Sequence, residues 1–455
     1  MSWNFRLHDG KVSRLLGDYR SRILVSSALM ISNLVLVLLA LHGLAAFFLN
    51  QETGPGLSIC HYSDRVYDDD MALMLRPKAP TRFGLMTSRY VEMVQAARGN
   101  QCTGTAAVGY DGHHYLQTGR SDDPGIMELM PAISRFFGVS IANSYDLFIL
   151  AVISSGVLVG YAGFWKLFGD RRLRVIGVAV FLCLAFAEAW IADDYIFPVA
   201  PLIAGIPWLL HLGITGKNLA LTLGATLLAF CSSWCSLIRS GSLAICLTFL
   251  LTLFSVRHRS QKPLLPLVLI FIACIPSVLF ARSVISRRDA ALAKIGESAK
   301  TDDSHAFWHT FYIGFGFIPN SEVPDYDDRV AAEKVRSIDP SAVFSSAKYQ
   351  AILRRELWSL LKRRPMLVIG TLAAKTGILI LLASILLCPV RRLIFAEPAT
   401  FWFDAASLLT IGMSAMNGIV AIPRLSYLLT FLCLILLYSS IKLCRSGWLT
   451  HGWES

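Results

Sequence analysis

Residues 366–387 read MLVIGTLAAKTGILILLASILL, and this stretch decides the fold because Lys375 is its only charged side chain. An apolar run of this length, folded as an α-helix, crosses the roughly 30 Å hydrocarbon core of a bilayer. Comparable runs recur along the chain. We therefore interpret the chain as an all-α polytopic membrane protein.

Ten apolar stretches near or above membrane-spanning length are candidate transmembrane helices. The two stretches on either side of Arg239 are the exception, because they could form one broken or re-entrant unit. The ten stretches are residues 23–49, 145–165, 175–191, 198–212, 219–238, 242–256, 264–280, 366–387, 401–422 and 425–443.

The composition of the whole chain agrees with this interpretation. Of 455 residues, 55% are hydrophobic and 16% are charged, whereas about a quarter are charged in a soluble domain. The formal net charge is +11, but many basic residues flank apolar blocks instead of forming a basic face on a soluble module. Nucleic acid is therefore not an expected partner.

The basic residues beside short connections all fall on one side of the membrane if there are ten spans. Cytoplasmic connections carry an excess of Lys and Arg, so we assign this side, with both termini, to the cytoplasm. The first span is too long for a cleaved signal peptide, and we interpret it as an uncleaved anchor. The flanking residues are Arg14, Arg20, Arg22, Lys166, Arg171, Arg172, Arg174, Lys217, Arg257, Arg259, Lys262, Arg391, Arg392, Lys442 and Arg445.

This topology predicts five regions. A cytoplasmic segment (1–22) precedes seven transmembrane helices (23–280), which include a first extracytoplasmic loop at 50–144. A second extracytoplasmic loop (281–365) precedes three further helices (366–443) and a cytoplasmic tail (444–455).

Each long loop contains an apolar pattern at helical spacing, at 124–137 and at 346–361. Such a pattern predicts an amphipathic helix lying on the membrane surface. The second loop also ends in Arg354, Arg355, Lys362, Arg363 and Arg364. This basic run departs from the positive-inside tendency, from which long translocated loops are largely exempt.

The most specific polar cluster is Gly109-Tyr110-Asp111-Gly112-His113-His114-Tyr115-Leu116 in the first loop. Flanking glycines allow the backbone to turn and present the carboxylate, which could deprotonate an attacking hydroxyl as a general base. A solvated turn with Asp at a turn position is the alternative.

The stretch from Tyr110 to Leu116, followed by Asp122-Asp123-Pro124-Gly125 and an amphipathic segment, resembles the first outer loop of the C-type integral-membrane glycosyltransferases. The resemblance covers the whole chain as topology but only about thirty residues as motif. It implies that Asp111 is the catalytic base, with His113, His114 and Tyr115 lining the site. It also implies a polyprenyl-phosphate sugar as donor, and we expect a lipid or glycan as acceptor. A bacterial inner membrane is the expected location, because no targeting signal is visible.

Two further acidic groups lie in predicted outer segments. Asp68, Asp69 and Asp70 could hold a divalent cation through oxygen ligands, or form a solvated acidic turn. Asp193 and Asp194 lie between two spans. The resemblance implies that such an acid contributes to the acceptor or metal site, and a hydrated helix cap is the alternative.

Basic and imidazole groups at the same predicted face are candidates for the donor phosphate. Arg239 and Arg424 could stabilise the leaving-group charge, or reach lipid headgroups. His305 and His309 are four residues apart and would share a helix face. The aromatic residues beside them, Trp308, Phe311, Tyr312 and Phe315, could stack on a sugar or anchor the loop at the interface.

The cysteines form no metal-ligand pattern. Cys60 and Cys102 fall in the same loop, and they could form a disulfide or remain two thiols. No cofactor is indicated beyond a candidate divalent cation.

These features favour an inverting glycosyltransferase. An O-antigen polymerase or ligase also works on lipid-linked glycans and differs mainly in loop pattern. A secondary transporter is disfavoured, because the spans are nearly free of charge apart from Glu188 and Lys375 and no internal repeat is visible. A non-catalytic assembly subunit is the remaining alternative.

Overall fold

The computed structural model describes ten segments of the chain: residues 108–110, 115–117, 136–137, 141–191, 196–239, 241–257, 264–294, 307–342, 346–423 and 425–446. These segments are helical apart from one short β-hairpin, formed by β1 (Val108–Tyr110) and β2 (Tyr115–Gln117). The predicted first span at 23–49 lies outside the described residues.

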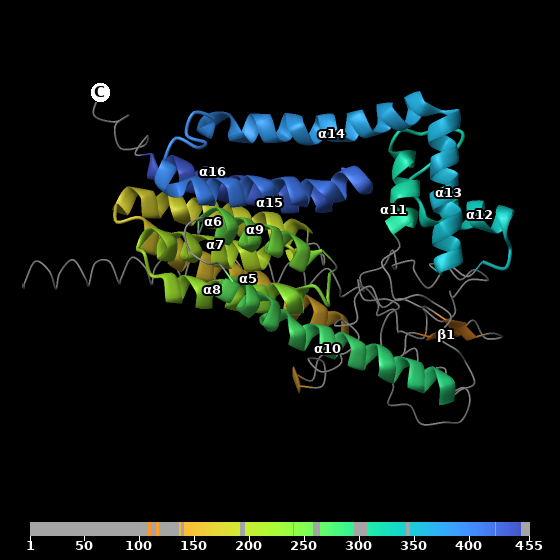
Figure 1. Ribbon diagram of the computed structural model, residues 1–455, viewed down its shortest axis with the longest axis horizontal. Helices are drawn as coiled ribbons and strands as arrows, with labels where there is room; N and C mark the ends of the chain where they lie inside the picture. Colours follow the sequence, from red (N-terminus) through yellow and green to blue (C-terminus); the bar gives the residue numbers. More distant parts are fainter. Residues whose placement is uncertain are drawn as a thin grey trace, which may run out of the picture.

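The other nine predicted spans coincide with long helices that form one bundle (Figure 1). Six of the described helices are long and apolar enough to cross a membrane, and shorter apolar segments lie at Leu173–Ala185, Ala200–Ile214 and Ser242–Arg257. The class of helical membrane protein is therefore confirmed, while the count of ten spans stays a prediction. The bundle contains α5 (Ile141–Leu167), α6 (Arg171–Ile191), α7 (Ala200–Ile214), α8 (Asn218–Cys235), α9 (Ser242–Arg257), α10 (Leu264–Lys294), α14 (Pro365–Leu387), α15 (Phe401–Val420) and α16 (Leu425–Arg445).

The segments on either side of Arg239 are two separate helices that pack against each other. Arg239 N–H donates to the Cys235 carbonyl, and the Ser242 hydroxyl donates to the Arg239 carbonyl at 2.8 Å. Gly241 has φ +94°, a left-handed conformation that favours glycine. The chain therefore reverses direction in a tight turn between α8 and α9.

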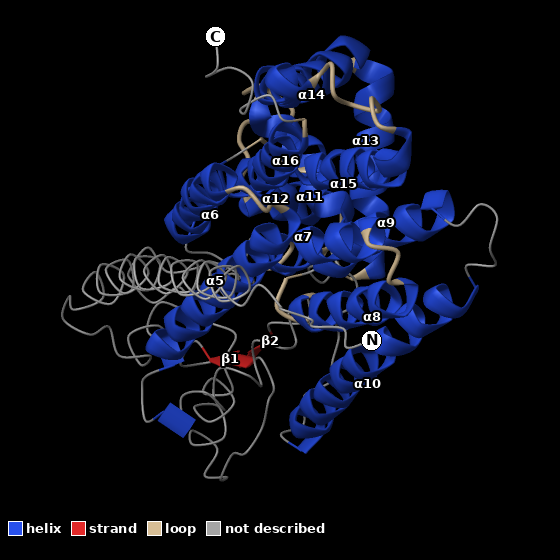
Figure 2. Cartoon of the chain, turned by 90° about the vertical axis from the view of Figure 1, so that its left-hand side faces the viewer, coloured by secondary structure: helices blue, strands red, loops and turns tan. Residues whose placement is uncertain are grey.

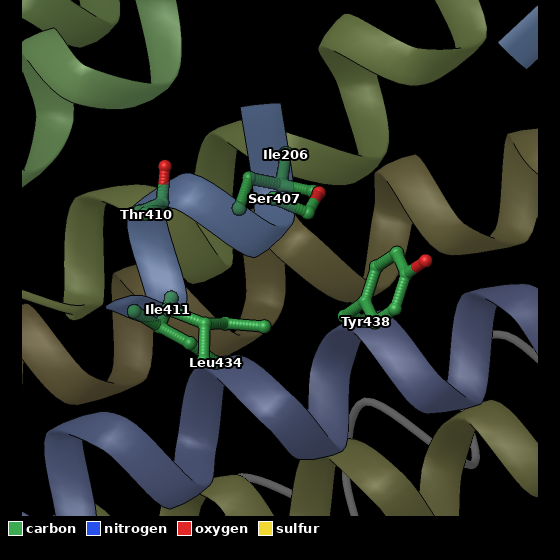
Figure 3. Close-up of a pocket in the computed structure, with 6 residues that line it drawn as sticks. All are labelled: Ile206, Ser407, Thr410, Ile411, Leu434 and Tyr438. Carbon is green, nitrogen blue, oxygen red and sulfur yellow. The ribbon is translucent and has the colours of Figure 1, made fainter. Parts of the chain in front are cut away.

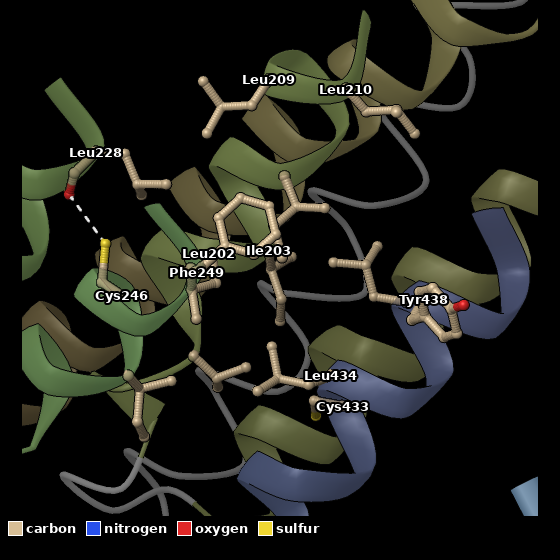
Figure 4. Close-up of a cluster of buried hydrophobic side chains, with 14 of the residues drawn as sticks. Leu202, Ile203, Leu209, Leu210, Leu228, Cys246, Phe249, Cys433, Leu434 and Tyr438 are labelled. Carbon is tan, nitrogen blue, oxygen red and sulfur yellow. Dashed lines mark hydrogen bonds between the residues drawn. The ribbon is translucent and has the colours of Figure 1, made fainter. Parts of the chain in front are cut away.

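The bundle has a central helix and lipid-facing helices. In the apolar window of α16, 78% of residues are buried, compared with 17% for α10 and 22% for α14. Figure 2 looks from the end opposite α11–α13 and shows α10 and α14 at the periphery. Side chains from α7, α9 and α16 meet in the core, among them Leu202, Phe249 and Leu434 (Figure 4). Large apolar side chains on α10 and α14 point outward, as expected in lipid.

The predicted second outer loop contains a small helical unit, which we call the outer unit: α11 (Phe307–Ile313), η3 (Gly314–Phe317), α12 (Asp328–Ile338) and α13 (Ala347–Arg363). It has its own apolar core, which includes Phe315, Val335 and Leu353. The outer unit and the β-hairpin lie at one end of the bundle, and α16 ends at the other (Figure 1). The described parts of the two long hydrophilic regions therefore lie at the same end of the bundle, while the predicted loop topology stays a prediction.

The amphipathic helix predicted at 346–361 is present as α13, but the prediction that its apolar face lies on the membrane is wrong. Tyr349, Leu353 and Leu360 are buried in the core of the outer unit. The apolar face is covered because α11 and α12 supply protein surface for it. Of the segment predicted at 124–137, the structure describes only residues 136–137.

Candidate functional site

The β-hairpin brackets the predicted catalytic segment. β1 and β2 are antiparallel, and Tyr110 pairs with Tyr115 at the end where the strands are joined. Asp111, His113 and His114 fall in the connection, which lies outside the described residues. The structure thus places the two ends of the motif next to each other at the end of the bundle that carries the outer unit (Figure 1).

Several other predicted site residues also lie outside the described part of the chain. This holds for the acidic candidates, for two phosphate-binding candidates and for the loop cysteines. They are Asp68, Asp69, Asp70, Asp193, Asp194, His305, Arg424, Cys60 and Cys102. The cysteines within the described segments form no disulfide with one another, and no group of three or more His, Cys, Asp or Glu side chains in those segments could hold a metal.

Arg239 lies half-buried at the turn between α8 and α9. At the far end of α9, Arg257 lies 5.1 Å from the ring centroid of Trp402, at the start of α15. Because α9 and α15 pack along each other, the start of α9 is directed toward the end of α15. Arg239 is therefore at the same end of the bundle as the outer unit.

His309 is buried inside the outer unit, with 2% of its surface exposed. Its Nδ1 lies 2.8 Å from the Tyr349 hydroxyl, which links α11 to α13. The Trp308 N–H donates to Gln350 Oε1 at 3.0 Å in the same contact. His309 therefore holds the two helices together and does not present its ring to a ligand in this conformation. Since α11 begins at Phe307, the described helix does not include His305.

The aromatic residues of this segment form the interior of the outer unit. Tyr312 and Phe315 are 3% and 1% exposed, while Trp308 and Phe311 pack against the same core from its edge. Burial, reinforced by the charges of Glu356 and Glu322, raises the pKa of Tyr312 to about 12. Of the four aromatic side chains that were predicted to stack on a sugar or to anchor the loop at the membrane interface, Tyr312 and Phe315 are thus core residues.

Lys375 is fully buried where α14 meets the outer unit. Its ammonium group donates to the carbonyl of Ala421 and, at 3.2 Å, to that of Ile419, and it lies 5.6 Å from the Phe315 ring centroid. Carbonyls at a helix C-terminus lack intrahelical donors and carry partial negative charge. Lys375, which belongs to α14, therefore supplies the hydrogen-bond donor for the carbonyl groups at the C-terminal end of α15.

The backbone of η3 packs directly on the end of α15. A Cβ atom on Gly314 would lie 2.4 Å from the Val420 carbonyl oxygen, and one on Gly316 would lie 2.3 Å from the Asp325 oxygen. Only glycine allows such close backbone contacts. Gly314, Phe315, Lys375 and the C-terminal residues 419–421 of α15 form what we call the outer joint. It fixes the outer unit to the bundle, and Arg424 follows it closely in the sequence.

A second buried polar cluster lies at the opposite end of the bundle. Asp404, which is fully buried, accepts from Tyr438 Oη at 2.9 Å and pairs with Lys442 Nζ at 3.1 Å. Phe395, with φ 59°, donates its N–H to the same carboxylate at 3.3 Å. One turn further along α16, Arg445 pairs with Glu397 at 2.7 Å, in a more exposed position.

The expectation that the spans are nearly free of charge apart from Glu188 and Lys375 is therefore wrong. Asp404 lies inside the predicted span 401–422, and Lys442, taken as an orientation signal, is 2% exposed. An acid inside an apolar span requires a partner. For Asp404 this rule favours Lys442, the cation at the end of the next span. The side chain of Glu188 is outside the described part.

Next to this cluster, a cavity of about 10 Å³ is lined by polar and apolar side chains (Figure 3). The Ser407 hydroxyl is buried there, without a hydrogen-bond partner among the described residues. The volume is close to what one water molecule needs. The cavity is much too small for a sugar, whose sites are typically hundreds of Å³. Its lining residues are Ile206, Ser407, Thr410, Ile411, Leu434 and Tyr438.

No protein-family model, no curated protein and no solved structure matches this chain. Functional assignment therefore depends on the motif around Asp111 and on where the fold places the groups near it.

Proposed function

We propose that this protein is an inverting, C-type membrane glycosyltransferase that moves a sugar from a polyprenyl-phosphate carrier to a lipid or polysaccharide acceptor. One observation carries the proposal: the hairpin that brackets Asp111 lies at the same end of the bundle as Arg239 and the outer unit. Catalysis on a lipid-linked donor requires such groups at one membrane face. The proposed location is the extracytoplasmic face of a bacterial inner membrane, with both termini in the cytoplasm.

In the proposed reaction, Asp111 accepts the proton of the acceptor hydroxyl as its oxygen attacks the anomeric carbon. The bond from that carbon to the phosphate oxygen breaks, and the configuration inverts. Arg239 and Arg424 are the proposed cations for the negative charge that develops on the leaving phosphate. Asp193 and Asp194 are proposed to contact the acceptor.

His309 has a different role in this proposal from the phosphate ligand expected at first. It is buried against Tyr349, so we assign it to positioning within the outer unit. Lys375 acts similarly, because it fixes the end of α15 from which the chain continues to Arg424.

The buried pair of Asp404 and Lys442 does not favour transport. Asp404 lies in the first turn of α15 and Lys442 in the last turns of α16. The pair therefore lies near one membrane face, whereas the binding sites of secondary transporters lie near the midplane.

The test is to delete the gene and compare the lipid-linked and surface glycans of the cell by mass spectrometry. Wild-type protein should restore one missing sugar, and Asp111→Asn should not, because loss of a general base slows transfer by roughly 10²–10⁴-fold. Asp64→Asn is the control, since it removes one carboxylate from the same loop outside the motif. Full restoration by Asp111→Asn at equal expression would remove Asp111 from the mechanism, and intact glycans with altered solute uptake after deletion would favour transport.

A further inference from the structure

The outward face of α13 is strongly basic. Between residues 347 and 364 there are six Lys or Arg side chains and one acid, Glu356. The apolar residues of the helix face inward, so the cations are left on the outside. Those exposed to solvent include Arg354, Arg355 and Lys362.

This basic face adjoins the lipid-facing surface. α13 ends at Arg363 and α14 begins at Pro365, and the two helices run crosswise to each other (Figure 1). Met366 and Ile369, in the first turns of α14, are 77% and 55% exposed. Since exposed apolar side chains of a spanning helix contact lipid, the residues immediately before them lie at the level of the headgroups.

Three residues on α13 combine charge with an aromatic ring. Arg354, Trp358 and Lys362 recur every four residues and so share one helix face, and Trp358 is 56% exposed. Neither Arg354 nor Lys362 has an ion-pair partner within the described residues. We call these three residues the basic stripe.

The neighbouring cations are less free to bind an anion. Arg363 lies 3.7 Å from Glu322 and 3.9 Å from Glu356, and Arg364 lies 3.9 Å from Glu322. These long, exposed contacts neutralise part of their charge. The uncompensated positive charge of α13 is therefore carried by the basic stripe and by Arg355, which is exposed and has no ion-pair partner among the described residues.

We infer that the basic stripe is a docking surface for the phosphate groups of anionic phospholipids of the surrounding bilayer. Cations beside a spanning helix attract anionic headgroups, and exposed Trp favours the same depth. The excess of cations is not explained by orientation, since this loop is assigned to the extracytoplasmic side. The inference does not depend on the proposed glycosyl transfer.

The test uses the full-length protein in phosphatidylcholine bilayers that contain phosphatidylglycerol, with one of the two lipids brominated near the headgroup end of its acyl chains. Bromine quenches nearby Trp fluorescence. The chain has 10 Trp residues, so the contribution of Trp358 is obtained as the difference from Trp358→Phe. Brominated phosphatidylglycerol should quench Trp358 more than brominated phosphatidylcholine does.

Replacing Arg354 and Lys362 with Gln should reduce this preference by roughly fivefold per cation at low ionic strength. The double substitution Arg329→Gln/Arg336→Gln is the matched control. It removes the same charge from α12, which lies beyond α13 as seen from the bundle (Figure 1), and it should leave the preference unchanged.

Equal quenching by the two lipids in the wild type would overturn the inference, and so would an unchanged preference in Arg354→Gln/Lys362→Gln. The third arm adds a trace of polyprenyl phosphate. If it displaces brominated phosphatidylglycerol from Trp358, the stripe binds a carrier lipid and the assignment to bulk phospholipid is wrong.

Discussion

Removing Lys442 should destabilise the protein more than removing any exposed cation. The carboxylate of Asp404 is fully buried and the ammonium of Lys442 is 2% exposed. Breaking a buried pair leaves an uncompensated charge and costs about 3–5 kcal/mol. Asp404 would keep its hydrogen bonds from Tyr438 and from the Phe395 N–H, so we expect Lys442→Met to cost about 3 kcal/mol, at the lower end of this range.

The assay is reversible unfolding in mixed micelles, titrated with sodium dodecyl sulfate. Lys442→Met/Asp404→Asn should recover at least about 2 kcal/mol relative to Lys442→Met, because the unpaired charge is gone. Arg445→Met is the control on the same helix. Its pair with Glu397 is partly exposed, so its loss should cost at most about 1 kcal/mol. Equal effects of Lys442→Met and Arg445→Met, or no recovery in the double variant, would refute this reasoning.

Three further predictions concern the outer unit. Lys375→Met should cost about 1–3 kcal/mol in the same assay, because two buried carbonyls lose their donor. Gly316→Ala should cost about 1–3 kcal/mol through overpacking, since its Cβ would lie 2.3 Å from a backbone oxygen. The pKa of Asp339 is lowered from 3.8 to about 2, first by the hydrogen bond from Lys348. Because this pKa is lower in the folded than in the unfolded state, the Asp339 carboxylate stabilises the fold at pH values above its unfolded-state pKa. The contact between α12 and α13 should therefore weaken as the pH falls from about 4 to 2. Hydrogen exchange, corrected for intrinsic rates, measures this change.

Each of these predictions has a matched control. Lys217→Met removes an exposed cation and should leave unfolding nearly unchanged. Gly370→Ala, where a Cβ would meet nothing within 4 Å, should be neutral or slightly stabilising. Asp339→Asn should reproduce the acid effect at neutral pH and remove its dependence on pH. If Lys217→Met lowered the free energy of unfolding as much as Lys375→Met, or Gly370→Ala as much as Gly316→Ala, the buried contact concerned would not have the assigned role. The same conclusion would hold for Asp339 if the pH effect persisted in Asp339→Asn.

The helices of the bundle could be predicted from sequence because the signal is local. The length of a run such as 366–387, with a single charged residue, is enough to predict its helix. The predicted and observed bounds of α14 and α9 therefore agree closely. Predicting α10 was less accurate, since it continues to Lys294, past the apolar run, into residues that are polar but good helix formers.

Contacts between distant segments could not be predicted in the same way. The apolar spacing of α13 predicts its helix, but the same spacing suits a membrane surface and a protein core equally well. Only the presence of α11 and α12 decides between them. The pairing of Asp404 with Lys442 and the capping of α15 by Lys375 likewise join residues far apart in the chain.

The candidate site was predictable as a set of residue types but not as an arrangement. His309 has the chemistry of a phosphate ligand, yet Tyr349 occupies its Nδ1. Arg239 was predicted at the outer end, and the antiparallel packing of α9 and α15 puts it at the end of the bundle that carries the outer unit. Gly314 carries no local signal of the outer joint, because the backbone that it contacts belongs to the end of α15, more than a hundred residues further along the chain.

The proposed site requires both hydrophilic regions to lie on one side of the membrane, opposite the end of α16. Cysteines introduced at 113, in the motif, at 337, in α12, and at 446, after α16, can be labelled with an impermeant maleimide in intact cells, with the native cysteines replaced. Labelling at 113 and 337 before permeabilisation, and at 446 only after it, is the predicted result. Labelling of 113 and 337 from opposite sides would contradict the proposed site.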